Sequence, residues 1–207
     1  MSDLSKIERV LGIVEYCLCE AFPRDFFRRC AFAGFGVRAL LQDMGIEAAM
    51  VGGQFAALVV APDRGRLAVQ GFKAGREPFP HFWVEADDRL IDLGPHLLAY
   101  GSDYPVLSMP ALAWEMSAPL PSAIRYKAQQ RLPHDTRMSI DQALNVRCDG
   151  FVRECRAVAA NGKATPALPT WLASNYASLL TAVDRGDAWA GEAKRFENIA
   201  QNHPLPF

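Results

Sequence analysis

Apolar residues near the start of the chain repeat with the period of an α-helix. They follow one another at the three- and four-residue offsets of one amphipathic face. The positions of this stripe are Ile7, Val10, Leu11, Val14 and Leu18. The pattern predicts a helix over about 4–21, ended by Pro23, because proline cannot continue a helix interior.

A second helical pattern starts near Arg28 and runs to Gly45. Its apolar positions are Ala33, Val37, Leu40 and Leu41. Glycine adopts the left-handed conformation of a helix C-terminus at little cost, so Gly45 is expected to end this helix. Cys30 then lies in its first turn or just before it.

After Gly45 the apolar period shortens to that of β-strands. Glycine, proline and aspartate break the segments from one another, as is typical of turns. The predicted strands are 47–61, 66–72, 81–86 and 89–93. They are expected to form a run of antiparallel strands.

The remainder of the chain is expected to contain an irregular segment followed by helices. Residues 95–137 contain many prolines and no clean period, which indicates a long excursion with at most short helices. Ser139 followed by Gln142 resembles a capping box that opens a helix ending near Asn161 and Gly162. Another helix carries Leu172, Tyr176, Leu179, Leu180 and Val183, stops at Gly186, and is followed by a last helix over about 187–201. The helical C-terminal part thus covers about 139–201.

Length and composition favour one ordinary globular domain over residues 1–207. With 207 residues, 50% of them hydrophobic and 22% charged, the chain can bury a core of its own. Its formal net charge of −1 gives no electrostatic support for binding nucleic acid. The order of elements, helices then sheet then helices, predicts the α+β class.

The start of the chain and its cysteines indicate a cytoplasmic protein. Asp3, Glu8 and Glu15 interrupt the first apolar residues, unlike a signal peptide. No stretch approaches the roughly 20 apolar residues needed to cross a bilayer, so no membrane partner is expected. The five cysteines are an odd number, which predicts reduced thiols.

Cys30 is the candidate nucleophile. A thiol attacks as thiolate, and a helix N-terminus with nearby cations favours that form. Cys30 follows Arg28 and Arg29 and precedes the small-residue segment AFAGFG, which lets other parts of the chain approach the helix start. The alternative is that Cys30 is a buried small hydrophobic residue, the common state of a free cysteine.

The segment HFWVEADDRLIDLGP places a histidine near a carboxylate. A two-residue turn at Asp87-Asp88 pairs Ala86 with Arg89 and sets His81 one diagonal from Asp92 on the same face of the hairpin. Diagonal neighbours lie about 7–8 Å apart, close enough for an imidazole–carboxylate hydrogen bond. A three-residue turn without a bulge would instead put the two side chains on opposite faces.

These residues resemble the core signature of the transglutaminase-like superfamily. The matching features are Cys30 opening a helix, LLQDMGIEAAMVGG, HFWVE, and a hairpin leading to IDLGP, together about residues 28–95. The segment is also similar to arylamine N-acetyltransferases and to the bacterial peptidases that mature lasso peptides. The resemblance implies a papain-like or transglutaminase-like core, in which the nucleophile helix packs on an antiparallel sheet and extra helices lie at both ends.

The resemblance also implies a Cys-His-Asp triad and no cofactor. Cys30 would be the nucleophile, His81 the base and then acid, and Asp92 the residue that orients His81. Reactions of this superfamily are acyl transfers through a thioester. No acetyl-donor site is recognisable between Cys30 and His81, and residues 96–207 match no family pattern.

Three further residues are candidates for binding the oxyanion or the substrate. The Cys30 backbone N–H is the first oxyanion donor, and Gln54 or the Trp83 indole could be the second. Arg24 lies six residues before Cys30, where papain-like enzymes have a glutamine, and could contact a substrate carboxylate. A zinc site is disfavoured because Cys17 and Cys19 are out of phase on one helix.

The sequence therefore predicts a cysteine hydrolase, peptidase or acyltransferase acting on a small-molecule or peptide substrate. Hydrolysis of an amide or peptide-like substrate through a thioester on Cys30 is favoured over transfer to an amine. The alternatives are a non-catalytic relative of the same fold that binds a peptide or small molecule, and a structural protein in which Cys30 is simply buried. The sequence does not indicate which oligomeric state the protein has.

Overall fold

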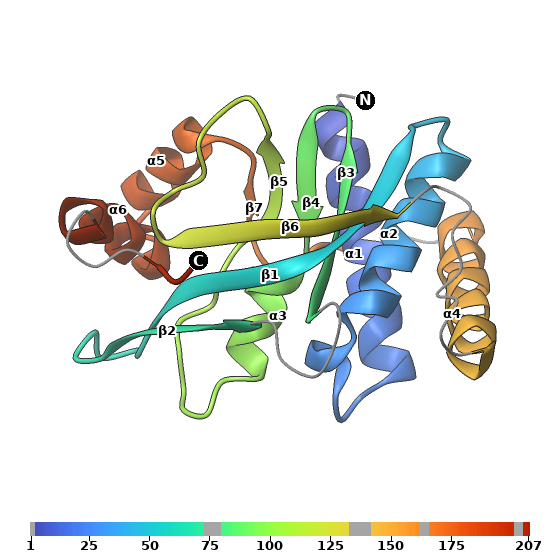
Figure 1. Ribbon diagram of the computed structural model, residues 1–207, viewed down its shortest axis with the longest axis horizontal. Helices are drawn as coiled ribbons and strands as arrows, with labels where there is room; N and C mark the ends of the chain where they lie inside the picture. The colour runs from blue at the N-terminus through green and yellow to red at the C-terminus, as the bar shows by residue number, and fades with distance from the viewer. Residues whose placement is uncertain (1–2, 73–79, 133–141, 162–165, 201–204) are drawn as a thin grey trace.

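Helices surround a curled mixed sheet in the computed structural model, which describes residues 3–72, 80–132, 142–161, 166–200 and 205–207 (Figure 1). The helices are α1 (Asp3–Ala21), the 3-10 helix η1 (Phe26–Arg28), α2 (Cys30–Asp43), α3 (Gly94–Tyr100), α4 (Gln142–Ala160), α5 (Tyr176–Asp184) and α6 (Ala188–Ala200). The strands are β1 (Ala48–Val60), β2 (Leu67–Phe72), β3 (His81–Ala86), β4 (Arg89–Asp92), β5 (Ala111–Glu115), β6 (Ile124–Leu132) and β7 (Leu172–Ala173). The fold is α+β, as the sequence predicts.

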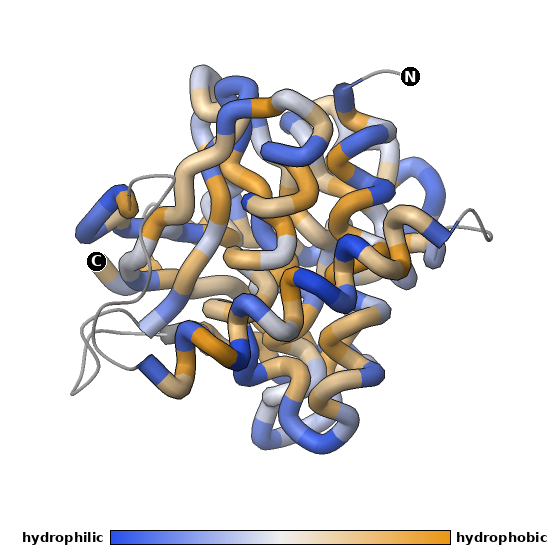
Figure 2. The backbone as a smooth tube through the Cα atoms, turned by 90° about the vertical axis from the view of Figure 1, so that its right-hand side faces the viewer, coloured by the Kyte–Doolittle hydropathy of each residue, from blue (hydrophilic) through white to orange (hydrophobic). Residues whose placement is uncertain are grey.

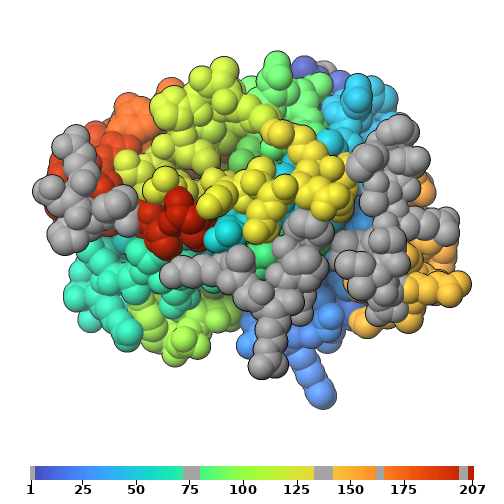
Figure 3. Space-filling view, in the orientation of Figure 1, coloured from blue at the N-terminus to red at the C-terminus, as the bar shows by residue number. Residues whose placement is uncertain are grey.

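The strands form a sheet in the order β2-β1-β3-β4-β5-β7, with β6 paired to β1 outside this path. Neighbouring strands are antiparallel except β5 and β7, which pair in parallel. The strands β1, β2 and β6 run across the direction of β3, β4 and β5, so the sheet is strongly curled (Figure 1). β6 lies at the surface in front of β1, with most of its residues exposed (Figure 3).

The helical stripe at the start of the chain is buried, which explains why α1 forms where the pattern predicts it. Its apolar residues pack against α2 and α4 in a first hydrophobic core. α2 approaches its neighbours closely through two glycines. A Cβ on Gly34 would lie 3.0 Å from Met50 of β1, and one on Gly36 would lie 3.1 Å from Val14 of α1. No helix in the described ranges is both long and apolar enough to cross a membrane.

Side chains of β3 alternate between two cores. Phe82 and Val84 belong to the first core with α1, α2 and α4, whereas Trp83 belongs to a second core that includes residues of α5 and α6. In the backbone trace, hydrophobic residues follow the inner segments and hydrophilic residues gather in the outer turns (Figure 2). His81 has the parity of Trp83, so it lies on the face of the second core.

The interpretation of residues 95–137 as an irregular excursion is wrong. The segment contains most of α3, together with β5 and β6. β6 forms because its backbone completes the long edge of β1, a pairing across about 70 residues that local periodicity cannot signal. The C-terminal part is also not purely helical, since Leu172 and Ala173 form β7 before α5 begins. Ser139 of the expected capping box lies outside the described residues.

The hairpin between β3 and β4 has the predicted two-residue turn. Ala86 pairs with Arg89, and Asp87 and Asp88 have φ angles of +49° and +53°. Positive φ at both central residues is the type I′ geometry that matches the twist of a hairpin. The parity on which the His81–Asp92 contact depends is therefore confirmed.

Replacing Asp88 tests the turn. Glycine occupies positive φ without steric cost, so Asp88→Gly is expected to raise the free energy of unfolding by about 0.5–1 kcal/mol. Asp88→Ala is expected to lower it by a similar amount, because alanine lacks the tolerance of aspartate for this conformation. Urea titration measures both. If Asp88→Ala is as stable as the wild type, the left-handed turn is contradicted.

Candidate active site

Cys30 is the first residue of α2 and is half-buried. The turn before it is held by Arg29, which pairs with Asp25 and lies over the Phe22 ring at 4.8 Å. The N-terminus of a helix carries partial positive charge, which favours an anionic side chain there. The placement of Cys30 at the helix start agrees with the sequence-based expectation.

The sheet opens where α2 reaches it. β1 pairs with β3 through Gly53, whose partner is His81, and with β2 from Phe55 onward. His81, the first residue of β3, lies where β1 stops pairing with β3 and begins to pair with β2. The Cys30 thiol lies near enough to His81 there to contribute to raising the pKa of the imidazole.

His81 is also bonded to Asp92. Its Nε2 lies 2.7 Å from Asp92 Oδ2, and the two side chains are only 1% and 4% exposed. The hydrogen bond occupies Nε2 and so fixes the orientation of the imidazole ring. Cys30, His81 and Asp92 are thus brought together in one chain of contacts, as the sequence predicts.

Asp92 accepts two further hydrogen bonds. The Tyr126 hydroxyl donates to Oδ2 at 2.5 Å, and the Gly94 backbone N–H donates to Oδ1 at 2.8 Å. Gly94 must be a glycine at this place, because a Cβ would lie 2.5 Å from Asp92 Oδ2 and 2.6 Å from His81 Cε1. The backbone at the start of α3 therefore closes over the His81–Asp92 pair.

Sequence reasoning missed Tyr126 and Gly94. Tyr126 lies on β6, in the segment expected to be irregular, and reaches Asp92 because it pairs with Phe55 across the sheet. No local sequence pattern indicates that Tyr126 pairs with Phe55. Gly94 had a weak signal, since IDLGP follows Asp92 directly, but the close approach is a property of the folded backbone.

Neighbouring charges raise the pKa of His81. Burial by itself lowers it, but the charge and hydrogen bond of Asp92, with a smaller contribution from Cys30, raise it from about 6.5 to about 10. The imidazolium form is therefore favoured at neutral pH. Burial, followed by the charge of Asp92, raises the pKa of Tyr126 well above its usual value, so this hydroxyl keeps its proton and donates it.

The three further candidates for binding the oxyanion or the substrate, Trp83, Gln54 and Arg24, lie in different parts of the structure. Trp83 stacks near His81, with ring centroids 6.1 Å apart, and its buried Nε1 has no hydrogen-bond partner within the described residues. Gln54 follows Gly53 on β1, is half-buried, and is one residue out of phase with the face of His81. Arg24 is exposed in the turn after α1, and the structure gives it no contact with the triad. The region described contains no group of three or more metal-ligating side chains.

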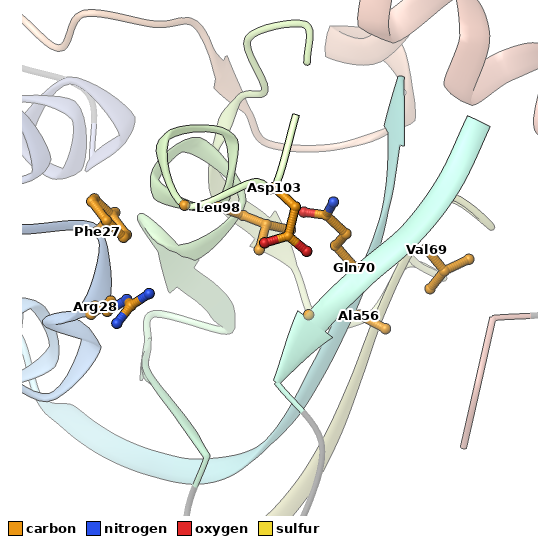
Figure 4. A pocket seen from close by; sticks show the side chains of 9 residues that line it. Phe27, Arg28, Ala56, Val69, Gln70, Leu98 and Asp103 are labelled. Carbon is orange, nitrogen blue, oxygen red and sulfur yellow. The ribbon is translucent and has the colours of Figure 1, made fainter. Parts of the chain in front are cut away.

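A pocket of about 330 Å³ lies beside the start of α2, between η1, β2 and α3 (Figure 4). Phe27 and Arg28 line one side, Gln70 and Asp103 come from the other, and Ala56 of β1 also lines the pocket. Arg28 is two residues from Cys30. A pocket of this size suits a small molecule or one part of a larger substrate.

Comparison with known proteins adds no identity. No protein-family model and no curated protein matches the chain. A solved structure described only as "The crystal structure of genomics APC5867" is similar with a TM-score of 0.47 and 16% sequence identity, covering 83% of this chain and 95% of that one. This likeness carries no argument about the site.

The pKa of His81 predicts how stability depends on pH. Because the folded pKa lies above the unfolded value, the stabilisation is present below about pH 6.5 and is lost as pH rises toward about 10. Relative to His81→Gln, the wild type should lose up to about 1.4 kcal/mol of unfolding free energy per pH unit in that window. Urea titrations at several pH values measure the difference. Parallel curves for the two proteins would contradict the raised pKa.

Proposed function

We propose that the chain has a papain-like or transglutaminase-like core and catalyses cysteine-dependent acyl transfer, with hydrolysis of an amide or peptide-like substrate as its main reaction. One observation carries the proposal: His81 is hydrogen-bonded to the buried Asp92, and Cys30, at a helix N-terminus, lies near enough to contribute to raising the pKa of the same imidazole. A thiol, an imidazole and a carboxylate in this order are the parts of a nucleophilic triad.

The proposed reaction uses the triad in two steps. Cys30 attacks the substrate carbonyl carbon as the thiolate, the nucleophilic form of a thiol. The sulfur–carbon bond forms, the carbon–nitrogen bond breaks, and His81 gives its proton to the departing amine. Neutral His81 then takes a proton from water, whose oxygen attacks the thioester and releases the carboxylic acid and the thiolate. Asp92 keeps the imidazole oriented through both steps.

The oxyanion that forms during each attack needs hydrogen-bond donors. The backbone N–H of Cys30 is the first candidate by its place at the helix start. Trp83 is favoured over Gln54 as a second donor, because its buried Nε1 has no partner within the described residues and its ring stacks near His81. No contact in the described part of the structure supports a role for Arg24 in binding a substrate carboxylate.

Hydrolysis is favoured because the pocket near the start of α2 is open to water. Several residues that line the pocket are exposed, among them Arg28, Val69 and Asp103. Transfer to an amine requires that water be excluded while the thioester waits. The cover expected from residues 95–137 is not a loose segment, since these residues form α3, β5 and β6, and the GREPFP segment lies almost wholly outside the described residues.

Turnover of activated acyl compounds tests the proposed reaction. The wild type should hydrolyse a panel of 4-nitrophenyl esters and 4-nitroanilides, and Cys30→Ala should reduce kcat by at least about a thousandfold. Product analysis at millimolar primary amine should still show mainly the acid. Full turnover by Cys30→Ala would rule out catalysis by this thiol. A product that is mainly the amide would show that transfer to the amine, not hydrolysis, is the main reaction.

The packing around Asp92 predicts a second set of effects. Tyr126→Phe should lower kcat about tenfold with little change in KM, because one hydrogen bond to a charged group is lost away from the substrate pocket. Gly94→Ala should lower kcat by about a hundredfold, since its Cβ displaces the His81–Asp92 pair.

The matched control is Gly191→Ala in α6, where a Cβ meets no atom within 4 Å. It should leave kcat unchanged. If Gly94→Ala is as active as Gly191→Ala, the geometry of the pair has no part in the reaction.

A further inference from the structure

Two charged residues of the pocket beside Cys30 are not used by the triad. The side chains of Arg28 and Asp103 extend into the space between them from two sides (Figure 4). Neither forms an ion pair with the described part of the chain, although Arg28 lies 5.6 Å from the centre of the Phe27 ring. The pocket therefore offers a ligand one positive and one negative group.

The remaining walls limit what can lie between these charges. Phe27, Ala56 and Leu98 supply apolar surface, and Gln70 is held by a 3.0 Å hydrogen bond from its amide to the Ser102 hydroxyl. With a volume of about 330 Å³, the pocket has room for a charged group the size of an amino acid.

We propose that this pocket binds the zwitterionic α-amino-acid head of the acyl substrate. The head's carboxylate would pair with Arg28 and its ammonium group with Asp103, because an α-amino acid carries both charges on one small carbon centre. An internal residue of a peptide carries neither charge. The substrates are then amides whose acyl group ends in a free amino acid, such as β-aspartyl or γ-glutamyl amides, and the γ-glutamyl amides are taken here as the example.

This inference rests on the proposed function and gives it a substrate class. Cys30 attacks the side-chain carbonyl of the γ-glutamyl group, the carbon–nitrogen bond breaks, and the amine leaves with the proton from His81. Water then cleaves the thioester, and free glutamate is released with both of its head charges intact.

Three 4-nitroanilides separate the two charges. L-γ-Glutamyl-4-nitroanilide has both, glutaryl-4-nitroanilide lacks the ammonium group, and 4-aminobutyryl-4-nitroanilide lacks the head carboxylate. The wild type should prefer the first compound in kcat/KM by about tenfold over each of the others, the ratio expected for one lost hydrogen bond between charged groups.

Variants of the two residues should remove the preferences one at a time. Arg28→Gln should abolish the preference over the 4-aminobutyryl compound and keep that over the glutaryl compound, and Arg28→Lys should restore part of it. Asp103→Asn should have the opposite pattern. Arg153→Gln, which changes an exposed arginine of α4 outside the pocket, should alter neither ratio.

Binding to the Cys30→Ala protein separates this inference from the proposed reaction. Isothermal titration with L-γ-glutamyl ethylamide, glutaryl ethylamide and 4-aminobutyryl ethylamide should give the same order of affinity, even if the wild type turns over none of the anilides. Binding in this order without turnover would contradict the proposed reaction and support the proposed ligand of the pocket. Equal affinity for all three, or preferences that survive in both Arg28→Gln and Asp103→Asn, would overturn the inference.

Discussion

The buried carboxylate of Asp92 fixes the relative positions of the elements around Cys30. A carboxylate removed from water is costly unless hydrogen bonds replace its hydration. Its three partners come from three elements: His81 from β3, the Tyr126 hydroxyl from β6 and the Gly94 amide from α3. A strand, an edge strand and the start of a helix must therefore meet at one point, and that point lies at the start of α2.

The same constraint determines the chemistry available to Cys30. Because Asp92 occupies Nε2 of His81, the ring has one orientation, and its charged form is favoured beside the thiol. Removing one partner of a buried charge typically costs about 3–5 kcal/mol, which is a large part of the roughly 5–15 kcal/mol that stabilises a domain. In this account stability and reactivity depend on the same contacts.

The sequence predicted those parts of the site that local rules determine. Cys30 at a helix start follows from the apolar period and Pro23, and the contact of His81 with Asp92 follows from the parity of a two-residue turn. Tyr126 could not be found this way, because its place depends on the pairing of β6 with β1, between segments far apart in the chain. The pocket charges Arg28 and Asp103 likewise come together only through the packing of α3 against η1.

The rate of alkylation at each cysteine tests whether Cys30 is the nucleophile. Cys17, Cys148 and Cys155 are buried, and burial with the hydrogen bond to Glu15 raises the pKa of the half-buried Cys19 to about 12. Peptide mass spectrometry after brief treatment with iodoacetamide at neutral pH should show Cys30 modified at least about tenfold faster than the other four cysteines. In Asp92→Asn, Cys30 should be modified more slowly than in the wild type. Modification of another cysteine first, with Cys30 protected, would contradict its assignment as the nucleophile.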